Sequence, residues 1–361
     1  MIRVLHVFGG LGTGGTESLI MNWYRNIDRS KIQFDFLVRS PDDNYLEEIT
    51  ALGGRVFYTA SFPRHLLRNF LETRKILQRK EWDVIHVHSN AAMYMLPLRL
   101  AKKLGYQHRI MHSHSVHSKN PVFSLVHRYN RKKINKYTTH QLACSNAAGE
   151  WMYPDSAFCV VNNAVQVDKF LFDQKVRNEI RTAMGIDNSL VLGHVGRFSK
   201  PKNHSFLLDI FYEVKQLQPD SVLMLVGDGE LQEAVKEKAK ALGLTESVLF
   251  MGRRSDIGQL MSAMDIFLLP SLYEGLPVVC VESSANALIS IISEEAYAQE
   301  LDCFPNVKSV TLKKSASEWA AFVLGNLNNA KPIYRNRNLV EGSSFDVDLV
   351  IKTLQDIYLT R

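Results

Sequence analysis

SLYEGLPVVCVESSANALIS, residues 271–290, directly follows the apolar run IFLLP and carries two carboxylates, Glu274 and Glu282, with seven residues between them. A short apolar run, a turn and then an apolar helical segment are typical of a buried parallel strand that leads into a helix. Gly275 and Pro277 hold this turn close to whatever lies at the end of the strand. Two unrelated surface acids are the simplest alternative, but Glu282 lies among apolar neighbours. We therefore expect the acids to contact different parts of one elongated, hydroxyl-rich ligand.

The same pattern of strand and helix recurs along the whole chain. Short apolar runs alternate with amphipathic segments such as LQEAVKEKAKALGL, which predicts parallel strands covered by helices on both faces. Each of two series predicts a Rossmann-like domain, so we expect an α/β fold in which two such domains face a central cleft. The expected strands are residues 2–8, 34–38, 84–88, RIMHSHS and QLACS, and then 190–196, 222–227, 248–252, 266–270 and 289–293.

The domain boundaries follow from a polar stretch at residues 165–188, which lacks strand character. We expect an N-terminal domain at residues 1–165, a C-terminal domain at 166–342 and a closing helix at 343–361, where apolar residues have helical spacing. A chain of 361 residues exceeds the usual size of one core, which agrees with two domains.

The composition indicates a globular protein of a reducing compartment. The chain has 46% hydrophobic and 22% charged residues, and its apolar runs end long before the roughly 20 residues that a membrane span requires. No signal peptide precedes the first expected strand, and the four cysteines show neither CxxC pairing nor metal-ligand spacing. We therefore expect a cytoplasmic location.

Basic residues are concentrated in one segment. No acidic residue lies between Asp83 and Glu150, whereas ten Lys or Arg and eight of the twelve histidines do. This favours an anionic partner, with a solvated basic face as the equal alternative; nucleic acid is disfavoured because stacking aromatics are not interleaved with the basic residues. SLVHRYNRKKINKY repeats Arg128, Lys132 and Lys136 every four residues, which predicts a helical face that contacts anionic lipid headgroups or a lipid pyrophosphate.

Two expected strand-to-helix turns carry groups suited to phosphate. GGLGTGGTES, residues 9–18, has glycines that let the backbone approach an anion at a helix N-terminus. Its spacing matches neither GxGxxG nor a P-loop, so ATP hydrolysis has little support. GRFSKPKNH, residues 196–204, places Arg197 and Lys202 where a diphosphate would meet a guanidinium, an ammonium and backbone amides. Two surface cations without a ligand are the alternative.

A histidine-rich segment, HSHSVHS, follows an expected strand at residues 112–118. Residues two apart on an extended segment point the same way, so His112 and His114 should share one face and reach a ligand. Hydrogen bonding to a substrate is favoured over metal binding, because no carboxylate lies nearby in the sequence to complete a metal site. A buried structural histidine is the competing interpretation.

Taken together, these motifs resemble a known family. GTGGTES, GRFSKPKNH, VGDGEL and PSLYEGLPVVCVES, in this order and at this spacing, are similar to those of GT-B glycosyltransferases of family four, and most of all to bacterial enzymes of exopolysaccharide and capsule assembly. The resemblance covers nearly the whole chain, including ACSNAAGEWMYP and VVNNAVQVDKF. It implies a GT-B fold with an acceptor-binding N-terminal domain and a C-terminal domain that binds the nucleotide sugar.

The resemblance also implies how the donor is held. The second acid, Glu282, binds the ribose hydroxyls, and the first, Glu274, faces the donor sugar. The backbone amides of three residues lie against sugar and phosphate: Gly275, Leu276 and Pro277.

The diphosphate and the reacting carbon are assigned by the same resemblance. Arg197 and Lys202 neutralise the diphosphate leaving group, while Gly14 and Gly15 close over it from the other domain. His114 matches the position near the reacting carbon. His114, Glu274, Arg197 and Lys202 are thus the expected catalytic residues, and neither a metal nor another cofactor is implied.

Some positions depart from the family pattern. Ala287 and Ile289 stand where a glycine and a proline are usual, and alanine at positive φ costs about 1 kcal/mol. Asn286 tolerates left-handed geometry and offers another residue at which the helix can end. Ala164 replaces a usual glycine, and Gln166 a usual aspartate. These changes affect local geometry more than the donor-binding loop.

The leading functional hypothesis is a retaining, metal-independent hexosyl- or N-acetylhexosaminyltransferase. The expected donor is a UDP-sugar, with guanosine diphosphate mannose as the alternative, and the expected acceptor is a lipid-linked saccharide at the inner face of the plasma membrane, where the chain associates peripherally. A nucleotide-sugar 2-epimerase shares the fold and would give product without an acceptor. A non-catalytic nucleotide-sugar-binding protein is the third hypothesis, suggested by Ala287 and Ile289.

Overall fold

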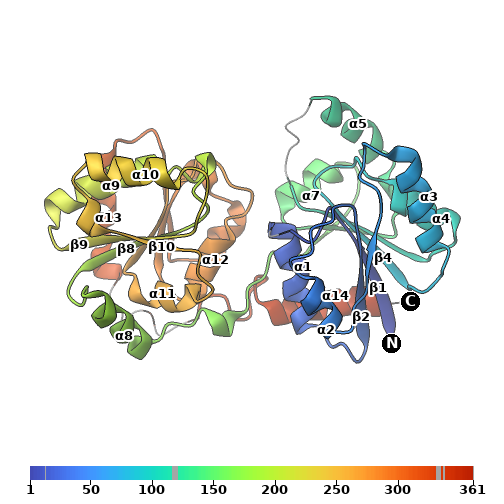
Figure 1. The fold of residues 1–361 in the computed structure, drawn as a ribbon, viewed down its shortest axis with the longest axis horizontal. Helices are drawn as coiled ribbons and strands as arrows, with labels where there is room; N and C mark the ends of the chain where they lie inside the picture. Colours follow the sequence, from blue (N-terminus) through green and yellow to red (C-terminus); the bar gives the residue numbers. More distant parts are fainter. Residues whose placement is uncertain (13, 116–120, 331–334, 336–337, 361) are drawn as a thin grey trace. The chain divides into compact units, whose positions relative to one another are not determined.

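The computed structural model describes all residues except 13, 116–120, 331–334, 336–337 and 361 (Figure 1). Its contacts divide the chain into unit 1, Met1–Ala164 with Val347–Arg361, and unit 2, Val165–Asp346. The chain therefore leaves unit 1 once and returns to it as the terminal helix α14 (Val347–Leu359), which packs on α1 and β1.

Unit 1 is built on a sheet of seven parallel strands in the order β3-β2-β1-β4-β5-β6-β7. The order reverses between β1 and β4, as in a doubly wound fold. The strands are β1 (Ile2–Val7), β2 (Ile32–Val38), β3 (Val56–Tyr58), β4 (Val84–Ser89), β5 (His108–Ser113), β6 (His140–Ala143) and β7 (Cys159–Val160).

Helices cover both faces of this sheet. Trp23 and Tyr358, from α1 and α14, pack on one face together with α2, and α3, α4 and α7 pack on the other. Both layers are closed by fully buried apolar residues, which explains the near-continuous apolar runs of the strands. The helices are α1 (Gly15–Asn26), α2 (Leu46–Ala51), α3 (Leu66–Leu77), α4 (Leu96–Lys103), α5 (Pro121–Arg131), α6 (Ile134–Tyr137) and α7 (Asn146–Met152).

Unit 2 repeats this plan with six parallel strands in the order β10-β9-β8-β11-β12-β13. Its strands are β8 (Leu190–Val195), β9 (Ser221–Val226), β10 (Val248–Gly252), β11 (Ile266–Leu269), β12 (Ile289–Ser293) and β13 (Val307–Val310). Its helices are α8 (Gln174–Met184), α9 (His204–Leu217), α10 (Gln232–Ala241), α11 (Ile257–Ala263), α12 (Val278–Ala285) and α13 (Ala316–Gly325). Helices α8, α11 and α12 pack on one face, and α9, α10 and α13 on the other. Two Rossmann-like α/β units confirm the predicted fold class.

The polar stretch at residues 165–188 is not a free connection. It forms α8, whose Arg177 and Arg181 are buried. Arg177 Nη2 lies 2.5 Å from Asp265 Oδ1, and Arg181 Nη1 lies 3.2 Å from Asp265 Oδ2. Both arginines also donate to carbonyl groups at the end of α11, where positive charge is favourable. The polarity of this segment therefore comes from buried ion pairs that fix α8 on unit 2.

The single basic helical face predicted around Arg128, Lys132 and Lys136 is wrong. Helix α5 ends at Arg131, a turn follows, and α6 begins at Ile134. The chain turns here because Ile134 enters the core, where it is fully buried. The three predicted basic side chains are all exposed, but they lie on two helices and the turn between them.

Helix α12 ends in a left-handed residue, and that residue is Ala287, with a φ of 49°. The N–H of Leu288 donates to the carbonyl of Ser283, and the N–H of Ala287 to that of Ser284, which is a Schellman motif. The expectation that Asn286 takes this role is wrong, since its φ is −83° and its side chain donates to Phe170 O at 2.7 Å. The usual glycine geometry is thus kept with an alanine.

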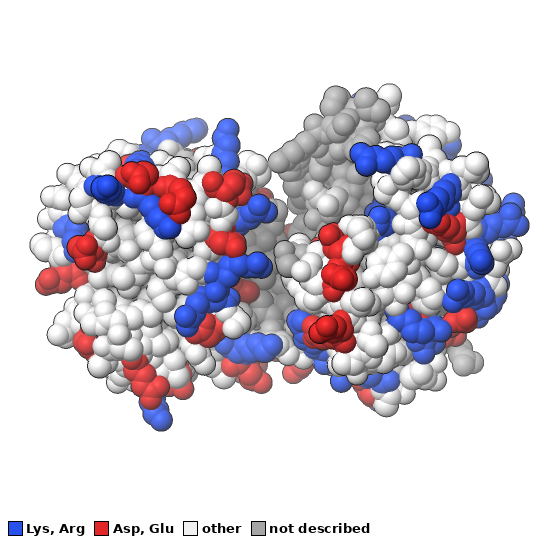
Figure 2. Space-filling view, in the orientation of Figure 1, with Lys and Arg blue, Asp and Glu red and all other residues white. Residues whose placement is uncertain are grey.

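The surface differs between the units. Figure 2 shows basic side chains gathered over α3 and α4 of unit 1, whereas acidic and basic side chains alternate over unit 2. Several apolar side chains of unit 1 are also exposed, including Leu67 and Leu71 on α3 and Leu125 and Tyr129 on α5. Within the described part of the chain, no helix combines the length and apolar character needed to cross a membrane.

Candidate active site

In each unit, the turns that follow the central strands of the sheet are the candidate functional positions. The strand order of unit 2 reverses between β8 and β11, and that of unit 1 between β1 and β4. In open parallel sheets, ligands bind outside the carboxyl ends of the strands at such a reversal. The turns that begin at Gly196, after β8, and at Pro270, after β11, therefore face the expected ligand position of unit 2.

Hydrogen bonds tie these two turns of unit 2 together. The N–H of Leu272 donates to Pro201 O at 2.7 Å, and Asn203 Nδ2 donates to Pro270 O at 3.1 Å. Asn203 adopts a left-handed φ of 53°, which brings the chain into α9. A Cβ at Gly196 would lie 3.3 Å from the Lys202 side chain, so the missing side chain leaves room for the lysine.

An ion pair connects the same turns. Lys202 Nζ lies 2.7 Å from Glu274 Oε1, and the two side chains are only 20% and 16% exposed. Partial removal from water makes this attraction stronger than that of a surface pair. The sequence grouped Lys202 with Arg197, but in the structure the direct partner of Lys202 is Glu274.

Glu282 lies on α12, the helix that follows this turn. Its carboxyl is partly buried, and removal from water raises the pKa of Glu282 to about 7, although the positive charge of Lys202 acts to lower it. Lys202 thus interacts electrostatically with Glu282 while it bonds Glu274. The structure brings the two acids of the opening sequence and one cation together at the carboxyl edge of the sheet.

Arg197 is placed differently. Its Nη2 lies 3.2 Å from Glu230 Oε2, and the side chains are 72% and 57% exposed, so this pair contributes little to stability. The VGDGEL turn holds the backbone beside Arg197: Gly227 has a φ of 139°, and a Cβ there would lie 2.1 Å from Gly196 O. Only glycine fits this close approach.

Backbone donors complete the unit 2 site. Pro277 has no N–H, so the expectation that it offers an amide is wrong; it caps α12, and its carbonyl accepts from Cys280 N at 2.8 Å. Gly275 and Leu276 keep their N–H groups, and a Cβ added at Gly275 would meet open space. The first N–H groups of α12 carry the positive end of the helix dipole, which favours an anion.

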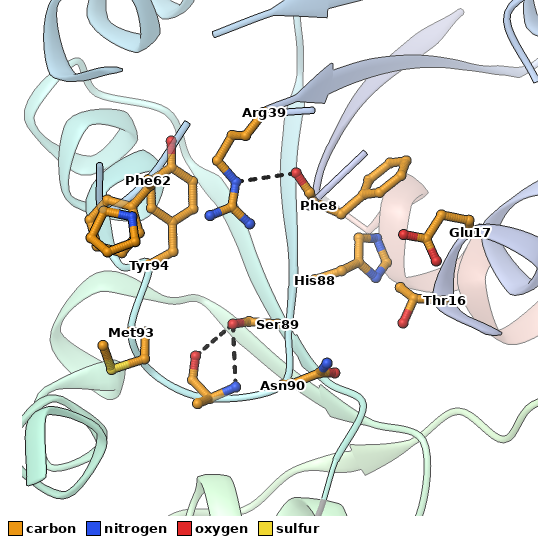
Figure 3. A pocket seen from close by; sticks show the side chains of 13 residues that line it. Phe8, Thr16, Glu17, Arg39, Phe62, His88, Ser89, Asn90, Met93 and Tyr94 are labelled. Atoms are coloured by element: carbon orange, nitrogen blue, oxygen red, sulfur yellow. Dashed lines mark hydrogen bonds between the residues drawn. The ribbon is translucent and has the colours of Figure 1, made fainter. Parts of the chain in front are cut away.

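Unit 1 carries a pocket at its own strand reversal. The cavity of about 320 Å³ lies where β1, β2 and β4 end and α1 begins (Figure 3). Gly14 precedes α1 and Gly15 opens it, and Thr16 and Glu17 of the first turn line the pocket. Burial raises the pKa of the Glu17 carboxyl.

Three histidines form a chain beside this pocket. His6 Nδ1 lies 2.9 Å from His88 Nε2, and His88 Nδ1 lies 2.9 Å from His114 Nε2. The ring centroids are 5.2 and 5.1 Å apart, and the planes differ by 19° and 28°. These values describe nearly coplanar rings bonded end to end. His114, which the sequence predicted, is therefore positioned by two histidines from neighbouring strands.

The direction of the hydrogen bonds follows from the buried end of the chain. Burial lowers the pKa of His6 and of His114 to about 3 and that of His88 well below its ordinary value, so all three rings are neutral. His6 Nε2 is buried and has no partner among the described residues. A bare acceptor costs less there than an unpaired N–H. His6 Nδ1 thus donates to His88 Nε2, and His88 Nδ1 donates to His114 Nε2. Because His114 Nε2 is an acceptor, the N–H of the neutral His114 ring is on Nδ1.

Two groups of three histidines have ring nitrogens close enough together to be considered as metal ligands. They are His6, His86 and His88, and His88, His112 and His114. The 2.9 Å between facing nitrogens is a hydrogen-bond distance, whereas two nitrogens on one tetrahedral zinc, each at about 2.0–2.1 Å, lie roughly 3.3 Å apart. His86 Nδ1 is also bonded to Tyr358 OH at 2.7 Å. The geometry favours a hydrogen-bonded chain over a metal site.

His112 has a structural position. Its ring lies 4.3 Å from that of His114, which confirms that the two side chains share one face. However, His112 is fully buried, and its ring stacks near Trp23 with centroids 5.6 Å apart. The expectation that it reaches a ligand is wrong, because α1 covers the sheet at this position.

The sequence missed the roles of His6, His88 and Arg39. A signal for the histidines was present, because IRVLHVF and VIHVH place them near the carboxyl ends of two expected strands. Arg39 follows the second expected strand directly, and only the structure shows that it lines the pocket of unit 1 (Figure 3).

Comparison with known proteins agrees with this arrangement. Residues 13–169 match the family described as Glycosyltransferase Family 4, and residues 176–301 match Glycosyl transferases group 1. "Putative glycosyltransferase EpsF" of Bacillus subtilis is 35% identical over 88% of this chain and 86% of its own. The "UDP-Gal:alpha-D-GlcNAc-diphosphoundecaprenol alpha-1,3-galactosyltransferase" of Escherichia coli is 27% identical over 81% of this chain and 79% of its own.

Solved structures show the same fold. Anabaena HepE in complex with UDP and glucose aligns with a TM-score of 0.78 over 99% of both chains at 20% identity. A glycosyltransferase of Rickettsia africae aligns with a TM-score of 0.81 over 99% of this chain and 97% of its own at 18% identity. Together with the family matches across both units and the 35% identical relative, these likenesses show that the chain belongs to the GT-B glycosyltransferases of family four.

Proposed function

We propose that the protein transfers a hexosyl or N-acetylhexosaminyl group from a UDP-sugar to a saccharide acceptor with retention of anomeric configuration. The main observation that supports this proposal is the cluster of Lys202, Glu274 and Glu282 at the strand reversal of unit 2. It offers a cation for a diphosphate and two carboxylates for hydroxyl groups. UDP is supported by the HepE complexes and by the name of the Escherichia coli relative.

The proposed roles follow from the chemistry of the departing group. Bond cleavage builds negative charge on the diphosphate, which Lys202, Arg197 and the N–H groups at the start of α12 stabilise, each typically by a few kcal/mol. Glu282 holds the ribose hydroxyls, and Glu274 faces the donor sugar. Gly14 and Gly15 approach the diphosphate from unit 1. Because Lys202, Arg197 and the dipole of α12 together balance the diphosphate, the reaction runs without a metal ion.

The stereochemistry follows from the state of the acids. Glu274 is bonded to Lys202 at 2.7 Å, which lowers its availability as a nucleophile. We therefore favour substitution on the same face of the sugar, assisted by the leaving phosphate, over a covalent intermediate. His114 donates a hydrogen bond from Nδ1 near the reacting carbon, as the direction of the histidine chain supports.

A lipid-linked acceptor and peripheral membrane association belong to the same proposal. The relative from Escherichia coli has a diphosphoundecaprenol acceptor in its name. Arg128, Lys132 and Lys136 are exposed, and Leu125 and Tyr129 add apolar area that is 68% and 61% exposed. Charge reversal at the three basic positions should release the protein from vesicles of anionic lipid in flotation assays. Unchanged recovery with the lipid would refute this part.

The transfer reaction is tested with purified protein, a panel of UDP-sugars and GDP-mannose, and lipid-linked acceptors. Glu282→Ala should weaken UDP binding, whereas Arg197→Ala should mainly lower turnover. Kinetics like those of the unaltered protein in both variants would contradict the site assignment. Epimerised donor formed in the absence of acceptor would instead identify a nucleotide-sugar 2-epimerase, and UDP binding without any product a non-catalytic binding protein.

A further inference from the structure

Arg39 is an unusual cation of unit 1. It follows β2 directly, and its guanidinium carbon lies 4.1 Å from the centroid of the Tyr94 ring. Its Nε donates to Phe8 O at 3.3 Å, and the structure gives its terminal nitrogens no partner among the described residues. Figure 3 shows these nitrogens directed into the pocket. Burial lowers the pKa of Arg39, which reflects the cost of holding a charge away from water.

Several other arginines of unit 1 bond a carboxylate, whereas Arg29 and Arg109 donate from their guanidinium groups to backbone carbonyls. Arg3 and Arg55 both bond the buried Asp35, with distances of 2.7 Å, and Arg25 bonds Glu48 at 2.6 Å. Among the described residues, no carboxylate lies within ion-pair distance of Arg39. A guanidinium that is half-buried without a counter-ion provides a site for an external oxyanion, which its planar donors can contact in a bidentate manner.

The support under Arg39 is rigid. Tyr94 is 3% exposed, and its hydroxyl donates to Asn69 Oδ1 at 2.9 Å. Phe62 packs beside it with a ring separation of 4.9 Å. The guanidinium therefore rests on a fixed aromatic surface, so little conformational freedom is lost when it binds an anion.

The opposite end of the pocket has different chemistry. Thr16 and Glu17, from the first turn of α1, lie across the cavity from Arg39 together with His88 (Figure 3). A carboxylate repels an anion but accepts hydrogen bonds from sugar hydroxyls. The two ends thus fix the orientation of a ligand that has an anionic end and a hydroxyl-bearing end. The volume of about 320 Å³ is at the small end of ligand pockets and suits one sugar unit.

We propose that this pocket is an acceptor subsite for an anionic saccharide, with the oxyanion bound by Arg39 and the sugar hydroxyls directed toward Glu17. The proposal rests on the proposed transfer reaction, because it names the class of its acceptor. The oxyanion is either a phosphate ester, as in a lipid-linked sugar diphosphate, or the carboxylate of an acidic sugar. Both present two oxygens to one guanidinium.

The test measures binding by calorimetry to the full-length protein, with excess UDP present to occupy the phosphate-binding turns of unit 2. The probes are α-D-glucose 1-phosphate, methyl α-D-glucuronide and the neutral methyl α-D-glucoside. At least one anionic probe should bind about 10-fold or more tightly than the neutral one. A preference for the phosphate or for the carboxylate then identifies the source of the anion.

Variants decide whether Arg39 causes the preference. Arg39→Gln should abolish it, Arg39→Lys should keep part of it, and Arg68→Gln, at an exposed arginine of α3, should leave it unchanged. Glu17→Gln should increase the affinity for anionic probes, because it removes a negative charge from the pocket. This variant still tests the proposal if Arg39→Gln fails to fold. Equal affinity for all three probes, or an anion preference that survives in Arg39→Gln, would overturn the proposal. Failure of UDP to bind would contradict the donor site and leave this subsite standing.

Discussion

Glu282→Gln should make the protein more stable at alkaline pH. The pKa of Glu282 is about 7 in the folded chain against an ordinary value of 4.5, a difference of about 2.5 pH units. At 1.36 kcal/mol for each pH unit, the folded state disfavours the ionised carboxylate by about 3 kcal/mol. Because the folded pKa is raised, the folded state holds a proton that the unfolded state releases between pH 4.5 and 7. The free energy of unfolding therefore falls across this window, and Glu282→Gln removes the fall.

The measurement is urea denaturation from pH 5 to pH 8, with hydrogen exchange of peptides from β12 and α12 to assign the change to unit 2. The free energy of unfolding of the variant should gain up to about 3 kcal/mol relative to the unaltered protein as the pH rises through this range. Glu237→Gln, on the exposed side of α10, is the matched control for loss of one carboxylate. Lys202→Met should move the transition above pH 7, because the charge of Lys202 lowers the pKa of Glu282. A constant difference between variant and unaltered protein at all pH values would refute the reasoning.

Three further outcomes are expected. Glu274→Gln should increase UDP affinity several-fold in calorimetry, because a competing anion leaves Lys202, and should lower transfer from a UDP-sugar; weaker UDP binding would contradict this. His88→Phe should lower turnover about 10-fold without changing UDP affinity, since His114 loses the ring that fixes its tautomer, and unchanged turnover would show that the histidine chain has no such role. Ala287→Gly should change the free energy of unfolding by at most about 1 kcal/mol, because relief of left-handed strain is offset by greater freedom of the unfolded chain, and a loss above about 2 kcal/mol in urea denaturation would contradict the strain argument.

The fold was largely predictable because the strands are buried on both faces. Ten predicted apolar runs correspond to ten observed strands. These strands are parallel and are connected by helices, as predicted. The strands missed are β3, β7 and β13, all at sheet edges, where two to four residues and one strand neighbour leave a weak pattern. The burial of α8 was not predictable either, because arginines in a sequence normally indicate an exposed segment. Only the structure shows that Asp265 lies beside the two arginines of this helix.

The site was predictable at the level of turns but not of partners. Strand-to-helix turns with glycine, cations and acids indicate a phosphate-binding edge from sequence alone. Which charges meet depends on contacts between segments distant in sequence, such as Lys202 with Glu274. The same holds for Arg39, whose pocket forms only when β1, β2 and β4 end together. Sequence spacing carries no information about such contacts, so a cation without a partner is visible only in the structure.

The charge balance around Lys202 limits how a diphosphate can bind. Lys202 bonds Glu274 and acts electrostatically on Glu282, so one cation already serves two carboxyl groups. A diphosphate adds further negative charge, and one lysine shared with two acids cannot balance it. The dipole at the start of α12 supplies part of the difference. Arg197 is suited to supply the remaining positive charge. Its exposed ion pair with Glu230 contributes little to stability, so Arg197 can exchange Glu230 for phosphate at a small cost in free energy. The donor site is therefore completed by a guanidinium that the structure holds outside the cluster.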